Sequence, residues 1–355
     1  SMGNPWEFSQ PDEKVEVGFG GTTERTTDEN GNFIVRWFPS QTVLGEPYNT
    51  MVPGYRTESV NVLRLWRARA TNAFNFQLFD EGDYTRAVEE KVLTENITKV
   101  LYPNDEPVAG KQLRLQQQYF FVSCSLQDML RIYLQKGDGL EQFHEKYVAQ
   151  LNDTHPAIAV PELMRLLIDE HRVDWDQAWH VTRHTFAYTN HTLLPEAMER
   201  WPLKLFEEML PRHLEIIYEI NQRFLDEARR QMHGVDGQVR SLSIIEEGQT
   251  QYIRMAHLAC VGSFAVNGVA RLHTELLKRD VLHDFYQLWP ERFSNKTNGV
   301  SPRRFLLLSN PGLAHLIRDQ IGCDWTIDLD TLRQLEELAD KTDFQHLWRK
   351  EKRAS

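Results

Sequence analysis

The sequence predicts an α/β fold with a mostly parallel sheet flanked by helices, preceded by a β-rich region. The first 55 or so residues contain short runs in which apolar and polar residues alternate, separated by glycine turns. Further along, long helical patterns alternate with short apolar runs that end in polar turns. At 355 residues with 41% hydrophobic side chains, the chain is long enough for about two domains with a sizeable core.

The charge balance excludes two classes of partner. The chain has 40 basic and 51 acidic residues, a net charge of −11, so we expect neither nucleic acid nor anionic lipid to bind. No apolar run approaches the roughly 18 residues of a membrane span, and no signal peptide is visible, so the predicted location is cytoplasmic. Three widely spaced cysteines, Cys124, Cys260 and Cys323, indicate reduced, mostly buried thiols rather than a disulfide framework.

The N-terminal region is predicted to be β-rich. Val15 to Val17 alternates with polar neighbours, Asp28 to Gly31 is a turn signal, and Phe33 to Phe38 alternates again, which indicates a hairpin. The glycines of Gly18 to Gly21 lack the G-x-G-x-x-G spacing and a following helix. A glycine-rich strand end is therefore favoured over a phosphate-binding loop.

Helical patterns dominate the next part of the chain. Tyr84 to Val100 and Leu113 to Gln135 each repeat apolar residues on one side. Further on, Pro202 suits the first position of a helix, and Pro211 begins a long helix that we expect to run to about Met232.

Residues 150–201 carry the most informative pattern. We expect a strand over Tyr147 to Leu151, a turn over Asn152 to Pro156 and a helix over about Ile158 to Glu170. Asp174 is a plausible N-cap of a second helix, which buries a face made of Trp175, Ala178, Trp179, Thr182 and Phe186.

Two polar turns bracket this pair of helices. The first reads LNDTHP, and the second, YTNHT, follows an extended segment over Phe186 to Thr189. In α/β folds, ligands bind beyond the carboxyl ends of neighbouring strands. The sequence therefore predicts a ligand site where these two turns meet.

The C-terminal part is less informative. Asn267-Gly268 interrupts an apolar run before a helix that ends in the cations Lys278 and Arg279. Asp328 to Asp340 is amphipathic, and the last residues, LWRKEKRAS, indicate a solvated tail.

Two other chemistries find no support in the motifs. His180 and His184 have the i, i+4 spacing of metal ligands, but no HExxH pattern and no third carboxylate ligand accompany them. A helix face is the better interpretation, and no metal is expected. No G-x-S-x-G motif marks a hydrolytic nucleophile.

Several long motifs in order resemble one family. The chain resembles the glycogen, starch and maltodextrin phosphorylase (α-glucan phosphorylase) family from about Gly3 to about Leu338. Besides the two turns, the motifs are NPWE (Asn4 to Glu7), PYNTMVPGYR (Pro47 to Arg56), VLYPND (Val100 to Asp105), LPRHLEIIYEINQRFL (Leu210 to Leu225), AVNGVARLH (Ala265 to His273) and NKTNGVSPRR (Asn295 to Arg304).

The resemblance implies a more specific fold. It implies the N-terminal domain of a GT-B-type two-domain glycosyltransferase, with residues 3–300 a partial glucan-binding domain and 301–355 the beginning of a truncated C-terminal domain. The GTGNMK-like motif that carries the family's pyridoxal phosphate lysine does not occur in the sequence. We therefore expect an internal fragment that lacks the start of the N-terminal domain and most of the pyridoxal phosphate domain.

The resemblance also implies a reaction. The full-length parent is expected to cleave α-1,4-glucosidic bonds with inorganic phosphate to give glucose 1-phosphate, with the phosphate of pyridoxal phosphate as proton relay. The fragment alone is expected to be inactive. The alternative is a non-catalytic α-glucan-binding or dimerisation module. A nucleotide-sugar glycosyltransferase is set aside because NDTHP, YTNHT and NKTNG occur together.

Site residues follow by motif. The resemblance implies that His191 and Asn298 bind the 6-hydroxyl of the glucosyl unit, that Val269 lines the pocket, and that Asp153, with His155, supports its wall. A neutral imidazole and an amide each offer a donor and an acceptor to a hydroxyl. Asp153 also has a purely structural interpretation, as a carboxylate that caps the following helix.

Two further sites are implied. The resemblance assigns an active-site gate to Asn104, Asp105 and Glu106, although animal enzymes have an amide at the last position. It assigns a glucan storage site to Tyr218, Asn221, Gln222, Ser243 and Glu247, where an aromatic ring stacks on a sugar and polar groups bind its hydroxyls. Animal enzymes have a lysine where this chain has Gln251.

Partners are implied in the same way. They are α-1,4-glucan with phosphate or glucose 1-phosphate, and a second subunit that packs on the Tyr84 to Val100 helix. Arg131 is followed by Ile132 instead of the second arginine of animal muscle-type members, so nucleotide control is not expected.

Overall fold

The computed structural model describes residues 4–29, 31, 33–71, 86–137, 139–232 and 236–354. The chain forms two compact units: Ser1–Val52 with Asn61–Lys296, and Pro53–Val60 with Thr297–Ser355. The predicted division into domains, residues 3–300 and 301–355, concerns the whole protein and stays a prediction.

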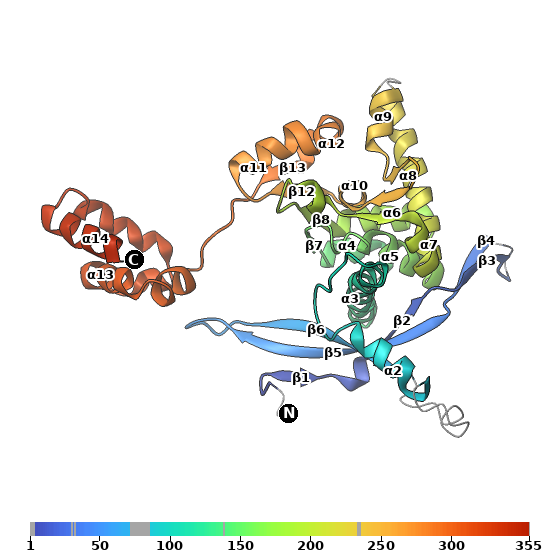
Figure 1. Ribbon diagram of the computed structural model, residues 1–355, viewed down its shortest axis with the longest axis horizontal. Helices are drawn as coiled ribbons and strands as arrows, with labels where there is room; N and C mark the ends of the chain where they lie inside the picture. The colour runs from blue at the N-terminus through green and yellow to red at the C-terminus, as the bar shows by residue number, and fades with distance from the viewer. Residues whose placement is uncertain are drawn as a thin grey trace. The chain divides into compact units, whose positions relative to one another are not determined.

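A parallel sheet lies at the centre of the first unit (Figure 1). Its strand order is β13-β12-β8-β7, and the strands are β7 (Ala149–Asn152), β8 (Phe186–Thr189), β12 (Ala265–Gly268) and β13 (Phe293–Asn295). All three pairings are parallel. The predicted α/β class with a parallel sheet is confirmed.

The connection from β7 to β8 matches the sequence pattern. α5 (Ala159–Arg165) continues as the π-helical η3 (Leu166–Glu170), and α6 (Trp175–Thr185) follows. The carboxylate of Asp174 accepts hydrogen bonds from the backbone N–H groups of Asp176 and Gln177, both at 3.1 Å, which confirms the predicted N-cap.

Most other helices of this unit pack around the sheet, whereas α2 lies away from it (Figure 1). The predicted helix over Tyr84 to Val100 corresponds to α2 from Arg86 on, and its first two residues lie outside the described part of the chain. The helices are α2 (Arg86–Asn96), α3 (Val108–Leu134), α4 (Phe143–Lys146), α7 (Leu203–Met209), α8 (Pro211–Gln231), α9 (Asp236–Leu242), α10 (Met255–Val261), α11 (Arg271–Leu276) and α12 (His283–Leu288).

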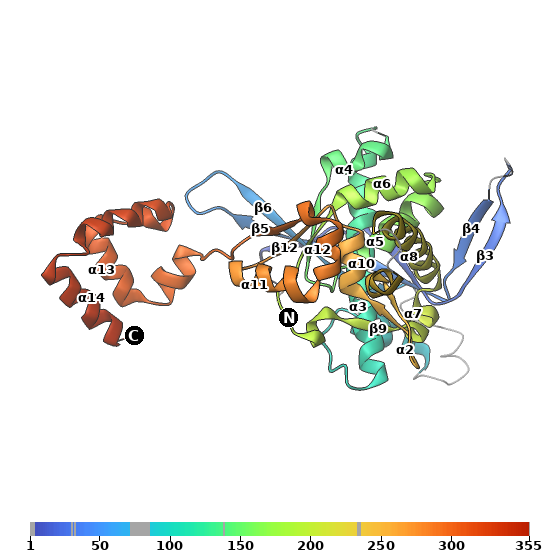
Figure 2. The same cartoon turned by 90° about the horizontal axis from the view of Figure 1, so that it is seen from above.

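Antiparallel strands form the N-terminal region, as predicted. β5 (Gln41–Pro53) pairs with β1 (Glu7–Ser9), β2 (Val15–Phe19) and β6 (Val60–Ala70). A hairpin of β3 (Thr22–Thr27) and β4 (Phe33–Phe38) extends beside α7 and α8 (Figure 2). The hairpin prediction was right in its second strand and turn, but Val15 to Val17 pairs with β5 instead, because a further strand precedes the turn.

A smaller antiparallel sheet completes this unit. It consists of β9 (Arg200–Pro202), β10 (Ile245–Glu246) and β11 (Tyr252–Arg254), in the order β10-β11-β9. The sheet holds the chain that follows the YTNHT turn against the start of α10, because the Met255 N–H donates to the Glu199 carbonyl at 3.1 Å.

The second unit is helical and has its own small core. Ala314 and Ile317 pack around Trp325, which is 1% exposed. The guanidinium of Arg303 lies 4.6 Å from the ring centroid of Tyr55, which ties the loop between β5 and β6 to this unit. The helical segments are η7 (Arg303–Leu308), α13 (Pro311–Ile321), η8 (Asp324–Thr326), η9 (Leu329–Leu338) and α14 (Thr342–Ala354), and the expected tail lies in mostly exposed turns of α14.

A buried carboxylate joins three helices of the first unit. Glu162 on α5 is fully buried and accepts hydrogen bonds from Ser123 on α3 at 2.6 Å, Arg165 at 2.7 Å and His213 on α8 at 2.6 Å. Burial alone raises the pKa of Glu162, but Arg165 and His213 outweigh it and hold the pKa at about 2. Glu162 is therefore ionised wherever the protein is folded at ordinary pH.

The cysteines are free thiols, as the sequence predicts. Cys124 and Cys260 are buried, Cys323 is exposed, and all three are free. Among the described residues no helix is both long and apolar enough to cross a membrane. The cytoplasmic location stays a prediction.

We predict that Glu162→Gln lowers the free energy of unfolding by about 3 kcal/mol, since it leaves the buried Arg165 without its main counter-charge. Glu219→Gln is the matched control, because it breaks only the exposed i, i+4 pair with Arg223 and should cost less than about 0.5 kcal/mol. Urea unfolding measures both. Equal losses in the two variants would contradict a structural role for the buried carboxylate.

Candidate functional site

Polar side chains form a row at the carboxyl ends of three neighbouring strands. The strand register places Asn152, Thr189 and Asn267 opposite one another. The Thr189 hydroxyl donates to Asn267 Oδ1 at 2.8 Å and accepts from Gln150 Nε2, also at 2.8 Å. The predicted meeting of the two polar turns at one sheet edge is therefore present.

Asp153 holds the first turn in an unusual conformation. Its φ of 68° lies in the left-handed region, which aspartate tolerates better than most residues. Its backbone N–H donates to the Thr189 carbonyl at 3.0 Å, and its carboxylate accepts from the Thr154 N–H at 2.7 Å. The structural alternative, a cap on the following helix, is therefore not found, because the Asp153 carboxylate binds within the turn and α5 begins only at Ala159 with no side-chain cap.

The second turn places His191 beside a histidine that the sequence reasoning did not assign. Burial and the neighbouring His191 both lower the pKa of His273. The His273 ring accepts the Val269 N–H at Nδ1, at 3.3 Å, while no described residue forms a hydrogen bond with its buried Nε2. His273 thus contacts Val269 and is close enough to the exposed His191 for the two rings to interact electrostatically, and the only sequence signal for His273 was its place at the end of AVNGVARLH.

Gly268 allows His273 to lie this close to the end of β12. A Cβ at this position would collide with His273 and Thr274 at the start of α11. The helix can approach the end of β12 only because this residue has no side chain.

Asn298 lies in the second unit, where it is exposed. The chain leaves the sheet just before it, where the Lys296 N–H donates to the Gly268 carbonyl at 3.0 Å. Asn298 therefore follows the end of β13 closely in the chain.

Two ion pairs and one hydrogen bond connect the predicted gate to the first turn. Asp105 accepts from Arg114 at 2.6 Å, and Arg114 also pairs with Glu199 at 3.2 Å. Glu199 in turn accepts from the Thr154 hydroxyl at 3.4 Å. The gate's backbone is also constrained, because a Cβ at Gly110 would collide with the carbonyl of Asn104.

The other gate residues are more open. Asn104 and Glu106 are exposed, and the Asn104 side chain accepts the Glu106 N–H at 3.1 Å. A cavity of about 250 Å³ separates the stretch before the gate from the first turn, and Tyr102, Arg114, Asn152 and His155 line it. The ring centroids of Tyr102 and His155 are 5.9 Å apart.

The predicted storage-site residues are only partly brought together. Asn221 on α8 donates to the Ser243 hydroxyl at 3.2 Å and accepts the Ile244 N–H at 2.8 Å. The Tyr218 ring is 43% exposed on the same helix. Gln222 and Glu247 have partners elsewhere, Asp226 at 3.0 Å and Arg240 at 3.0 Å.

A cavity of about 470 Å³ adjoins this region, lined by Ser243, Glu247, Arg229 and Arg240 among others. Gln251, at the position of the lysine in animal enzymes, is exposed, and its carbonyl accepts the Leu203 N–H at 3.0 Å. The polar groups are suited to hydroxyls, and the exposed ring to a sugar face.

His180 and His184 are packed with a third histidine, His144 on α4. The ring centroids of these three residues are 4.3 to 5.4 Å apart. Burial, His184 and His144 lower the pKa of His180. Within the described ranges, no group of three His, Cys, Asp or Glu side chains has the geometry to hold a metal ion.

The strand-end site is defined by neutral hydrogen-bonding groups. Its amides, hydroxyls and imidazoles, with one carboxylate, match the donors and acceptors of a sugar, and the site lies where ligands bind in parallel α/β sheets. The fold and the site therefore define an α/β protein with a polar site at the strand ends whose chemistry suits sugar hydroxyls.

Comparison with known proteins places the chain more narrowly. The family model described as carbohydrate phosphorylase matches residues 1–355, so the chain belongs to this family. It is 57% identical over 352 residues to a glycogen phosphorylase of Synechocystis sp., covering 99% of the chain and 42% of that protein.

Animal proteins are similar as well. The chain is 52% identical to the brain form of human glycogen phosphorylase, covering 94% of the chain and 40% of that protein. It is 50% identical to the human muscle form, covering 96% and 41%. The chain thus spans about two fifths of the length of the curated relatives it matches.

The buried imidazole of His257, near Ser243, makes the free energy of unfolding depend on pH. Its Nδ1 contacts the carbonyls of Leu242 at 3.3 Å and Ser243 at 3.1 Å. Burial and the nearby Arg254 lower the pKa of His257 to about 4, against an opposing effect of Asp284. Below the ordinary value of 6.5, the unfolded chain therefore binds this proton more readily than the folded chain does.

We predict that the free energy of unfolding falls by about 2 kcal/mol through this group between pH 7 and pH 4.5. In His257→Gln the amide can still donate to the carbonyls, but it does not titrate, so the pH dependence should be shallower by that amount. Urea unfolding of both proteins at several pH values measures the difference. Parallel pH profiles would show that His257 does not contribute.

Proposed function

We propose that this chain is the sugar-binding part of an α-glucan phosphorylase, which cleaves α-1,4-glucosidic bonds with inorganic phosphate to give glucose 1-phosphate. The observation that carries the proposal is the row of neutral polar groups at the strand ends with His191, Val269 and His273 beside it. Family membership and the printed names of the relatives, glycogen phosphorylase, support it.

Each site residue has a proposed task. His191 and Asn298 bind the 6-hydroxyl of the glucosyl unit, and Val269 lines the pocket. His273 is a positioning residue, because the bond from the Val269 N–H fixes its ring next to His191. Asp153 holds the turn that carries His155, through its bond to the Thr154 N–H.

Pyridoxal phosphate supplies the proton relay in the proposed reaction when it is bound. The strand-end side chains do not fit a coenzyme phosphate, since Asn152, Asp153, Thr189 and Asn267 offer no cation to pair with it. We therefore assign them to sugar hydroxyls only and expect the GT-B-type whole protein to hold the coenzyme by other residues.

The gate is proposed to control access to this site. Asp105 is linked through Arg114 and Glu199 to the Thr154 hydroxyl, so displacement of the gate breaks an ion pair in the series of contacts that ends at the first turn. The cavity of about 250 Å³ next to it gives the segment room to move.

A second candidate function is α-glucan binding without catalysis. Tyr218, with its 43% exposed ring, lies on the same helix as Asn221, whose amide meets the Ser243 hydroxyl. These residues are separate from the strand ends, so glucan can bind there whether or not the chain is catalytically competent.

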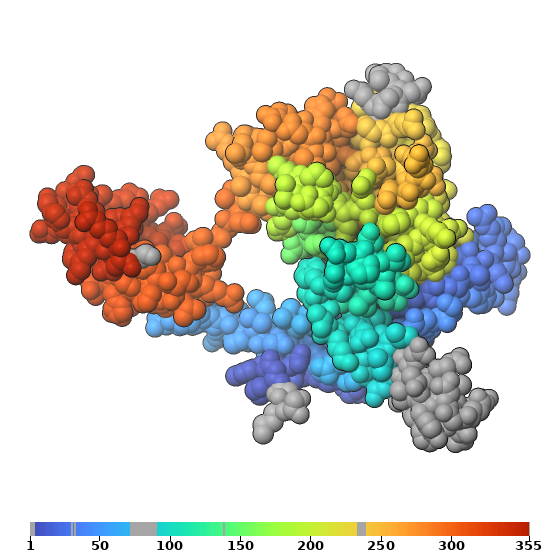
Figure 3. Space-filling view, viewed as in Figure 1, coloured from blue at the N-terminus to red at the C-terminus, as the bar shows by residue number. Residues whose placement is uncertain are grey.

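We also propose that α2 is a subunit contact. Val92 and Leu93 on this helix are 48% and 56% exposed, and the surface of α2 and the start of α3, cyan in Figure 3, faces the viewer. Packing on a second copy would bury these side chains. Light scattering measures the oligomeric state, so comparison of the wild type with a Val92→Asp, Leu93→Asp double variant tests this contact.

We expect the purified chain alone to form no glucose 1-phosphate from maltoheptaose and phosphate. The glucosyl group needs charge stabilisation on the side facing the phosphate as well as the sugar contacts described above. Enzymatic detection of glucose 1-phosphate after prolonged incubation tests this. Phosphate-dependent formation of glucose 1-phosphate by the chain alone would refute the proposal that it supplies only the sugar contacts.

In the whole protein that contains this chain, His191→Ala should lower kcat/KM about tenfold, the effect of about 1.4 kcal/mol from one hydrogen bond. The loss should appear with glucose 1-phosphate as donor and vanish with 6-deoxyglucose 1-phosphate, which lacks the contacted hydroxyl. His180→Ala, on the outside of α6, is the matched control and should change neither rate. An equal loss with both donors would exclude the 6-hydroxyl contact.

Tyr218 tests the second candidate function. Tyr218→Ala should weaken maltoheptaose binding to the chain about tenfold, because the ring face is lost, while Tyr218→Phe should retain most of the affinity. Calorimetric titration measures all three proteins. Unchanged binding in Tyr218→Ala would place the glucan elsewhere, and no binding by the wild type would exclude an independent glucan-binding module.

A further inference from the structure

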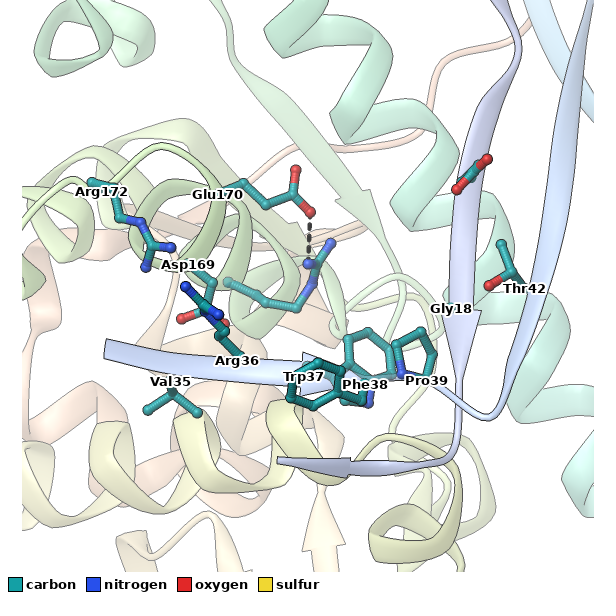
Figure 4. Close-up of a pocket in the computed structure, with 12 residues that line it drawn as sticks. Gly18, Val35, Arg36, Trp37, Phe38, Pro39, Thr42, Asp169, Glu170 and Arg172 are labelled. Carbon is teal, nitrogen blue, oxygen red and sulfur yellow. Dashed lines mark hydrogen bonds and ion pairs between the residues drawn. The ribbon is translucent and has the colours of Figure 1, made fainter. Parts of the chain in front are cut away.

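A groove outside the sites described above lies between the hairpin strand β4 and the end of η3 (Figure 4). Two cavities of about 370 Å³ and 510 Å³ form it, and both are lined by Val35, Asp169 and Arg172. Their sizes fall in the range of roughly 300–1,000 Å³ that is usual for small-molecule pockets.

Two of the arginines that line the first cavity have no counter-charge. Arg36 and Arg172 are exposed, and their side chains make no hydrogen bond or ion pair with any described residue. Glu24 lies opposite Arg36 in the hairpin register, yet the two do not form an ion pair. The other arginines of the groove are neutralised, Arg165 by Glu162 and Glu170 and Arg212 by Asp169 and Glu215.

Arg172 occupies its position at a conformational cost. The π-helical turn closes with the His171 N–H on the Leu166 carbonyl at 3.1 Å and the Val173 N–H on the Leu167 carbonyl at 2.9 Å. Arg172 between them has a φ of 59°, a left-handed conformation that helix ends usually give to glycine or asparagine. The two flanking hydrogen bonds hold Arg172 in this conformation, and its side chain forms no ion pair with a described carboxylate.

The rest of the first cavity is rigid and rich in hydrogen-bond acceptors. The Glu170 carboxylate is held by Arg165 at 2.7 Å, marked by the dashed line in Figure 4, and the Asp169 carboxylate by Arg212 at 2.8 Å. The ring of Trp37, on the hairpin strand β4, is fixed by its Nε1–H bond to the Gly20 carbonyl at 2.7 Å. Held carboxylates accept hydrogen bonds from hydroxyls, and an indole edge packs on a sugar ring.

We propose that this groove binds a sugar phosphate, with the phosphate on Arg36 and Arg172 and the sugar hydroxyls on the carboxylates of Asp169 and Glu170. Two free guanidinium groups match the oxygens of a phosphate monoester. A neutral sugar would leave both cations unpaired. A nucleic acid is disfavoured by the net charge of −11 and by the acidic floor of the cavity.

Calorimetric titration of the chain at low ionic strength tests the site, with glucose 6-phosphate, inorganic phosphate and glucose as separate probes. We expect saturable binding of glucose 6-phosphate, binding of phosphate at least tenfold weaker, and no binding of glucose. Arg36→Gln and Arg172→Asn should each weaken glucose 6-phosphate binding tenfold or more. Asparagine is chosen because it accepts the left-handed conformation, so this variant should fold at least as stably as the wild type.

Arg25→Gln is the matched control, since Arg25 is an exposed arginine of the same hairpin that lines neither cavity. It should leave the affinity unchanged. Absence of saturable binding, or binding that survives Arg172→Asn, would overturn the proposal, as would phosphate binding as tight as glucose 6-phosphate. If Arg36→Gln unfolds the hairpin, Arg172→Asn alone decides. The outcome is independent of the maltoheptaose titrations, which probe Tyr218 on another surface.

Discussion

The ionised carboxylate of Glu162 is the interaction on which the arrangement of the first unit depends. It is fully buried on α5, where Arg165 of the same helix, Ser123 of α3 and His213 of α8 bind it. A charge removed from water is tolerated only where hydrogen bonds and opposite charge replace the solvent, so the helices that carry these partners have little freedom to shift. Burial lowers the pKa of His213, while its bond to Glu162 opposes that effect.

This network positions two surfaces at once. On one side, α5 follows the first polar turn, so fixing α5 also fixes Asp153 and its bond to the Thr189 carbonyl. On the other side, Arg165 reaches Glu170 and lies 5.5 Å from the ring centroid of Trp37, which ties the hairpin and the groove to the same helix. The proposed glucan site and the proposed sugar-phosphate groove therefore share one rigid support. Binding in the groove has a direct structural connection to the strand ends through α5.

The charge distribution separates the two sites chemically. The strand ends present amides, hydroxyls and imidazoles, and burial together with His191 lowers the pKa of His273. The groove keeps Arg36 and Arg172 unpaired above carboxylates that are already bound. A neutral glucosyl unit suits the first environment and a phosphate monoester the second. The two proposed sites of this unit therefore differ in the ligand charge that they favour.

The sequence by itself determined the local elements and the order of the motifs. The strand and helix pattern from β7 to β8, the Asp174 cap and the two polar turns were predictable, because periodicity and capping depend on residues close together in the chain. It did not reveal that Val15 to Val17 pairs with β5, nor that His273 lies beside His191, nor that Arg36 and Arg172 line one groove. Those facts depend on residues far apart in sequence. Only the packing of β12 against α11, and of the hairpin against η3, brings them together, and the burial and charge pairing that decide their chemistry exist only after that packing.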